Sequence, residues 1–163
     1  MKVLLALVVA LGALMVPVSA RANVPFECGA AALRPSFGSL DAAMSHEFGK
    51  LRLTNVSTGP CWVQGYGGLS FVKHRGGAQV GAPASRTPSS RPKVILAPGA
   101  SVVSEVEITS VGPYDPALCR PTKVAGFRVF VPDATDAKFV RFPFTTCANR
   151  SLGMLQHKAY RRA

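Results

Sequence analysis

The chain has 163 residues, of which 48% are hydrophobic, so it is long enough and apolar enough to form one domain with a core. This length, with no internal repeat and no dividing linker, argues against a multidomain protein. The 19 Lys and Arg residues outnumber 8 Asp and Glu, and the formal charge of +11 favours contact with anionic surfaces.

The N-terminal segment has the layout of a secretory signal peptide. Lys2 precedes an apolar stretch over residues 3–16, and small residues follow up to Ala20 and Ala22, where we expect cleavage. The stretch is shorter than the roughly 20 residues that span a bilayer, so no transmembrane anchor is expected. Residues 23–163 would then form a secreted or envelope-associated domain, and losing Lys2 and Arg21 lowers its charge from +11 to +9.

All four cysteines lie in this exported part, where disulfides persist. Four cysteines allow three pairings, and the sequence does not choose among them. We prefer sequential pairing of Cys28 with Cys61 and Cys119 with Cys147, which closes two loops worth about 3–4 kcal/mol each. No C-x-x-C occurs, so we expect neither a metal site nor a cofactor.

Further along the chain, the hydrophobic pattern has a period of two residues, typical of short strands. Strands are predicted within residues 50–55, 61–66, 69–74, 93–99 and 101–109, and within a hairpin over residues 126–144. Gly67 and Gly68 should provide a tight reversal between the second and third strands. Residues 76–92 are predicted to be a basic loop with a short strand near Gln79, and residues from about 156 to 163 a mobile basic tail. Such strands and turns predict an antiparallel β-sandwich.

The hairpin suggests a binding face. Its near-symmetrical turn predicts that three residue pairs lie opposite each other: Arg128 and Arg141, Phe127 and Phe142 on the buried face, and Phe130 and Phe139 on the outer face. Like charges that face each other need a counter-charge. Glu105 and Glu107 on an adjacent strand could supply it, and so could an anionic ligand.

The stretch TNVSTGPCWVQGYGG, residues 54–68, is predicted to be a structural corner. Asn55 and Ser57 can bond to the nearby backbone, and Trp62 is expected in the core or under a loop, with an exposed binding role as its alternative. Tyr66, which follows Gly65, is similarly ambiguous.

This stretch also carries a family resemblance, together with CGAAALRPSFG from Cys28, LAPGAS, and the later cysteines. The chain resembles the DUF4232 family of secreted and lipid-anchored proteins, which is best known from actinobacteria. The resemblance implies an immunoglobulin-like β-sandwich with no established activity. The chain lacks the lipobox cysteine of the lipid-anchored members.

Motifs for catalysis are absent: there is no G-x-S-x-G, and HEFGK at His46 is not H-E-x-x-H. A copper site is a remote alternative, and it would have to gather Met44, His46, Met154 and His157 from distant parts of the chain.

We therefore expect a non-catalytic protein that binds an anionic envelope polymer, glycan or lipid headgroup. Nucleic acid is not an expected partner, because the chain carries an export signal. The alternatives are a structural or host-directed secreted protein whose charge is incidental, and an enzyme without a recognisable motif.

Overall fold

The computed structural model describes residues 24–163, so the predicted signal peptide lies outside the described residues. The regular structure of the described part is almost entirely β, with one 3-10 turn, η1 (Ala30–Ala32), and one short helix, α1 (Pro116–Cys119). No helix among residues 24–163 is long and apolar enough to cross a membrane.

The strands form three sheets. The largest has the order β2-β4-β10-β13-β8, with β3 beside β4 and β14 beside β10. Its bounds are β2 Leu33–Phe37, β3 Asp41–Ala43, β4 His46–Asn55, β8 Ser85–Arg86, β10 Ser101–Thr109, β13 Leu155–His157 and β14 Arg161–Arg162. The second has the order β12-β11-β6-β7, with bounds β6 Gly68–Val72, β7 Gln79–Val80, β11 Pro121–Phe130 and β12 Ala137–Cys147. The smallest has the order β1-β5-β9, with bounds β1 Phe26–Glu27, β5 Cys61–Val63 and β9 Val94–Leu96.

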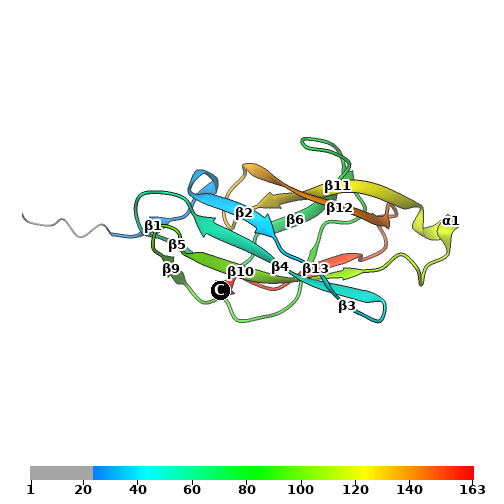
Figure 1. Cartoon of the computed structure of the whole chain (residues 1–163), viewed down its shortest axis with the longest axis horizontal. Helices are drawn as coiled ribbons and strands as arrows, with labels where there is room; N and C mark the ends of the chain where they lie inside the picture. The colour runs from blue at the N-terminus through cyan, green and yellow to red at the C-terminus, as the bar shows by residue number, and fades with distance from the viewer. Residues whose placement is uncertain (1–23) are drawn as a thin grey trace, which may run out of the picture.

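The two larger sheets pack together around one core. Phe37 of β2 lies 5.0 Å from Phe127 of β11 and 4.8 Å from Phe142 of β12, measured between ring centroids. Their strands run along the long axis of the molecule, with β1, β5 and β9 at one end and α1 at the other (Figure 1). This arrangement confirms the all-β class and the packed antiparallel sheets. The pairs β1–β5 and β13–β8 are short parallel exceptions, and the immunoglobulin-like strand order stays a prediction.

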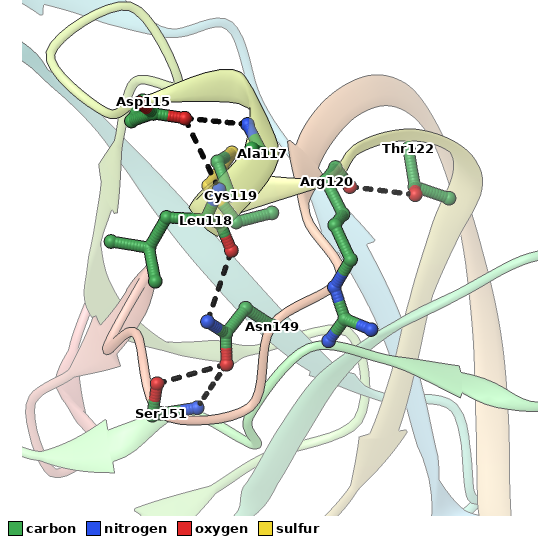
Figure 2. The surroundings of a disulfide bond; sticks show 9 residues. Asp115, Ala117, Leu118, Cys119, Arg120, Thr122, Asn149 and Ser151 are labelled. Atoms are coloured by element: carbon green, nitrogen blue, oxygen red, sulfur yellow. Dashed lines mark hydrogen bonds between the residues drawn. A yellow bond between two sulfur atoms is a disulfide. The ribbon is translucent and has the colours of Figure 1, made fainter.

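Both preferred disulfides are confirmed, one at each end of the molecule. Cys28–Cys61 joins the start of the described chain to β5, and Cys119–Cys147 joins α1 to the end of β12. Around the second bond, Asp115 accepts hydrogen bonds from the first backbone N–H groups of α1, and Asn149 Nδ2 donates to Leu118 O at 3.0 Å (Figure 2). These bonds satisfy backbone groups that a four-residue helix would otherwise leave without a partner.

The predicted hairpin exists, but its register is wrong by two residues. Arg128 lies opposite Phe139 rather than Arg141, Phe127 opposite Val140 rather than Phe142, and Phe130 opposite Ala137 rather than Phe139. The turn comes one residue earlier than expected, because Asp133 adopts φ 54° and Ala134 N donates to Val131 O. A slip of two residues keeps each side chain on its face, so the hydrophobic pattern alone could not detect it.

The C-terminal segment is not a mobile tail. β13 and β14 both pair with β10, and Ala159 and Tyr160 between them are buried. Glu105 of β10 contacts this segment, 2.7 Å from Lys158 Nζ and 2.5 Å from Arg161 Nη2. β10 belongs to a different sheet from β11 and β12, so the expected pairing of Glu105 and Glu107 with the hairpin arginines is also wrong.

Gly67 and Gly68 do not make the expected tight reversal. β5 and β6 belong to different sheets, and the chain crosses between them here. A Cβ atom on Gly67 would lie 2.2 Å from the Phe130 carbonyl oxygen, so this glycine permits close approach of two backbones. The short strand near Gln79 is confirmed as β7.

Candidate binding pocket

A polar pocket of about 580 Å³ opens beside the only tryptophan of the chain. We call it the Trp62 pocket; it is lined by Glu27, Trp62, Gln64, Gly65, Tyr66, Arg86, Arg91 and Asp133. These residues come from β1, β5, the segment after β5, β8, the segment before β9 and the β11–β12 turn. The pocket therefore forms only when distant parts of the chain come together.

Trp62 occupies the outer side of β5. Cys61 and Val63 on either side of it point into the core and are buried, whereas Trp62 is half-buried. Lys93 Nζ lies 3.9 Å from the centroid of its ring, which is cation–π distance. Trp62 therefore lines the pocket, with Lys93 over its ring. It is neither packed in the core nor fully exposed, so it lies between the two placements that the sequence suggested.

Tyr66, another pocket residue, is held by hydrogen bonds to the basic loop, residues 76–92. Its hydroxyl donates to Thr87 O at 2.8 Å and accepts from Ser89 N at 3.0 Å. Ser89 Oγ in turn accepts from Ala159 N at 2.9 Å, so the C-terminal segment supports the same part of the pocket. Gly65 adopts φ 83°, a conformation that glycine enters readily, and its carbonyl accepts from Tyr160 N at 2.9 Å.

The pocket is bordered by three cations. Arg86 lies over the Tyr66 ring, with Cζ 5.6 Å from the ring centroid, and Arg91 and Lys93 approach along the chain before β9. Within residues 24–163 the ion pairs involve Glu105 and Glu107, and none of these three cations takes part in one. Their charges therefore face a pocket that also contains the carboxyl groups of Glu27 and Asp133.

Behind Tyr66 lies His157, which is 2% exposed and meets the tyrosine ring edge to face at 5.8 Å. Burial, with a further contribution from the positive charge of Arg86, lowers the pKa of His157 to about 4. The imidazole is therefore neutral at pH 7 and adds no cation to the pocket.

Two carboxyl groups, Glu27 and Asp133, complete the lining. Loss of hydration raises the pKa of Glu27, and so do a hydrogen bond and charge repulsion involving Asp133, against the charge of Lys93. The pocket thus combines cations, hydrogen-bond acceptors and aromatic surface.

The predicted hairpin face does not form a comparable site. Its outer side carries Arg128, Phe130, Phe139 and Arg141, as expected from the alternation. Arg128 Nη2, however, donates to Gly77 O at 2.5 Å, and Arg75 lies over the Phe139 ring at 5.0 Å. Arg128 is thus engaged with the backbone, and of these four residues only Arg141 is exposed.

The expected corner is built by Asn55, which is completely buried. Its side-chain amide donates to Gly59 O and Leu96 O at 2.9 and 3.0 Å, and its Oδ1 accepts from Ser57 N and Ser57 Oγ at 2.9 and 2.7 Å. Asn55 and Ser57 close the turn before Cys61, and the later part of the stretch supplies pocket residues from Trp62 to Tyr66.

The residues of the copper alternative do not converge. Met44 is fully exposed, whereas Met154 is buried against the Cys119–Cys147 disulfide. His46 Nδ1 lies 2.9 Å from Glu107, and His157 is buried beside Ser104.

Another hollow, of about 420 Å³, lies on β4 near Phe48, Lys50 and Arg52. It also holds two carboxylates, and one of them, Glu105, is paired with Lys158 and Arg161 of the C-terminal segment. The cation–π contacts among residues 24–163 involve Phe139, Tyr66 and Trp62, so neither aromatic ring of this hollow has a cation over it, unlike the two rings of the Trp62 pocket.

Sequence reasoning missed five members of the pocket and its border, namely Glu27, Arg86, Arg91, Lys93 and Asp133. One signal was present: the preferred Cys28–Cys61 disulfide brings the neighbours of the two cysteines together, and Glu27 pairs with Trp62 in the β1–β5 register. Arg86 and Arg91 belong to the predicted basic loop, but no local sequence pattern indicated that they lie near Trp62.

One family model matches the chain, described as a domain of unknown function (DUF4232), over residues 28–157. No curated protein and no solved structure matches.

Proposed function

The chain belongs to the DUF4232 family, and we propose that it is a non-catalytic binding protein that acts outside the cytoplasm. Its partner is an anionic component of the cell envelope or the extracellular medium, held at the Trp62 pocket. The observation that carries the proposal is that Arg86 and Arg91 line the same pocket as Trp62 and Tyr66, and that among residues 24–163 neither arginine takes part in an ion pair. Two disulfides and the excess of basic residues support an extracellular role.

Co-sedimentation with envelope fractions tests the proposal. Oxidised protein lacking residues 1–22 is mixed with fractions from its source organism at low and at physiological salt, and the bound share is measured. The Arg86→Gln/Arg91→Gln variant is the test, and Arg34→Gln/Arg141→Gln is its control. The control removes the same charge at two exposed sites outside the pocket.

We expect retention at physiological salt that falls at least about tenfold in the test variant and little in the control. Equal losses in both variants would indicate a diffuse effect of net charge, and would contradict a role for the pocket. A loss of retention confined to the control would contradict the role of the pocket and would favour Arg141 and the hairpin face as the binding site. No retention under any condition would favour a structural or host-directed protein whose charge is incidental.

A further inference from the structure

The composition of the Trp62 pocket is unusual for a simple anion site. Arg86, Arg91 and Lys93 attract negative charge, yet Glu27 and Asp133 lie among them. A phosphate or another ion that carries only acceptor oxygens would meet both attraction and repulsion here. The carboxyl groups need donors, so the matching ligand carries hydroxyl groups as well as an anionic group.

The aromatic lining adds a third requirement. Trp62 and Tyr66 are half-buried, and each has a cation against its ring, Lys93 at 3.9 Å and Arg86 at 5.6 Å. Both rings stand at the pocket wall, where their apolar surface can contact C–H groups of a ligand. The volume of about 580 Å³ suits a small cyclic molecule or one unit of a polymer.

Resting on the proposed function, we propose that the Trp62 pocket recognises an acidic saccharide, a sugar ring that carries one carboxylate or phosphate substituent. Arg86 and Arg91 bind the anionic substituent through paired N–H donors. Glu27 and Asp133 accept hydrogen bonds from ring hydroxyls, and Trp62 contacts the face of the ring. The same pocket discriminates against anions that lack hydroxyl groups and against neutral sugars.

The part of the pocket around Tyr66 is preorganised for this task. Tyr66 is fixed by its bonds to Thr87 and Ser89, and Gln64 Nε2 donates to Arg91 O at 3.1 Å. The backbone segments that carry both arginines are thus tied to the segment after β5. Such ties reduce the ordering cost that a ligand would otherwise have to meet.

Intrinsic fluorescence offers a direct test, because Trp62 is the only tryptophan in the chain. Oxidised protein lacking residues 1–22 is titrated separately with glucuronic acid, glucose 6-phosphate, glucose and inorganic phosphate at constant ionic strength. We expect the two acidic sugars to shift the emission with dissociation constants at least about tenfold lower than those of glucose and phosphate. Equal affinities for inorganic phosphate and the acidic sugars, or no saturable shift with any probe, would overturn the inference.

Variants separate the two halves of the pocket. Arg86→Gln/Arg91→Gln should weaken both acidic sugars at least about tenfold, while Arg34→Gln/Arg141→Gln leaves them unchanged. Glu27→Gln/Asp133→Asn should raise the affinity for inorganic phosphate and narrow its gap from the acidic sugars, since the repulsive charges are gone. Unchanged selectivity in the carboxyl variant would contradict the assigned role of Glu27 and Asp133. Thermal unfolding of each variant shows that the fold is retained.

The sugar titration and the co-sedimentation experiment can fail independently of each other. Envelope retention that depends on Arg86 and Arg91, with no response to either acidic sugar, would keep the binding role and reject the ligand class. A response to acidic sugars without envelope retention would keep the ligand class and place its source elsewhere.

Discussion

At the residue scale, two Asn-x-Ser turns use the same bonds in different surroundings. In each, the asparagine Oδ1 accepts from the serine N and Oγ, and its amide donates to a backbone carbonyl. Asn55 is completely buried and donates to a second carbonyl, Leu96 O, whereas Asn149 is half-buried. Burial should therefore decide what each turn contributes to stability.

We predict that Asn55→Ala lowers the free energy of unfolding by about 2–4 kcal/mol, because it leaves buried backbone carbonyls without a donor. Asn149→Ala, the matched change at the other turn, should cost about 1 kcal/mol. Urea denaturation of the oxidised proteins measures both values. A loss at Asn149 equal to that at Asn55 would show that burial does not set the cost.

At Tyr160, the hydroxyl group and the aromatic ring should contribute differently to stability. Its side chain is 1% exposed, its hydroxyl has no hydrogen-bond partner among the described residues, and burial raises the pKa of that hydroxyl. Tyr160→Phe removes a buried hydroxyl group that makes no hydrogen bond in the folded protein, so we expect the free energy of unfolding to stay equal or to rise. Tyr160→Ala empties a core position and should cost about 3–5 kcal/mol. Thermal unfolding distinguishes the two, and a large loss for Tyr160→Phe would mean that the hydroxyl has a partner after all.

At the scale of elements, the C-terminal segment is held by both packing and charge. Glu105 bonds Lys158 and Arg161 across the β10 edge, and these hydrogen bonds lower the pKa of Glu105 to about 2, from an ordinary value of 4.5. A carboxyl group whose pKa falls on folding stabilises the folded state above its unfolded pKa. That contribution is lost as the pH falls from about 4.5 toward 2.

Accordingly, Glu105→Gln should lower stability at pH 7 by at most about 1 kcal/mol, since the pair is open to solvent. The difference from the unmodified protein should shrink as the pH falls to 2. Glu107→Gln, two residues along the same strand, is the control, because the ion pair of the Glu107 side chain is with His46 rather than with Lys158 or Arg161. Chemical denaturation at several pH values tests this, and a difference that grows toward low pH would reverse the assigned sign.

Strand positions were predictable from sequence where the signal is local. The alternation in residues 50–55 and 101–109 identified parts of β4 and β10, because one face of each strand packs into the core. The hairpin register was not predictable, since a slip of two residues preserves the faces. The pairing of β14 was missed because the partners of Arg161 and Arg162 stand about sixty residues earlier in the chain, beyond any local pattern. The Trp62 pocket was not predicted for the same reason, because its residues come from six separate segments of the chain.

At the scale of the whole molecule, one end strand of each large sheet contacts an end strand of the other, and both of these strands carry a proline. β2 and β12 are the end strands of their sheets and contact each other, and each contains a proline, Pro35 and Pro143. Proline cannot donate to a neighbouring strand, so it limits further pairing at an edge. The sandwich is thereby kept from extending into a larger sheet.

The two disulfides connect different parts of this molecule. Cys28 and Cys61 belong to the main core and adjoin Glu27 and Trp62, whereas Cys119 and Cys147 form a small separate cluster with Met154 near α1. On the chain-entropy model each bond contributes about 3–4 kcal/mol. Their effects on stability should be similar, and their effects on the pocket should differ.

The prediction is that Cys28→Ser/Cys61→Ser reduces the response of Trp62 to an acidic sugar at a temperature where the variant is still folded. Without the bond, Glu27 is kept beside Trp62 by the two-residue parallel pairing of β1 with β5 and by the hydrogen bond from Cys28 N to Trp62 O at 2.9 Å. Cys119→Ser/Cys147→Ser should lose comparable stability but keep the fluorescence response, because none of its neighbours lines the pocket. Equal loss of binding in both variants, at matched fractions folded, would mean that the pocket depends on the rigidity of the whole sandwich rather than on the local disulfide.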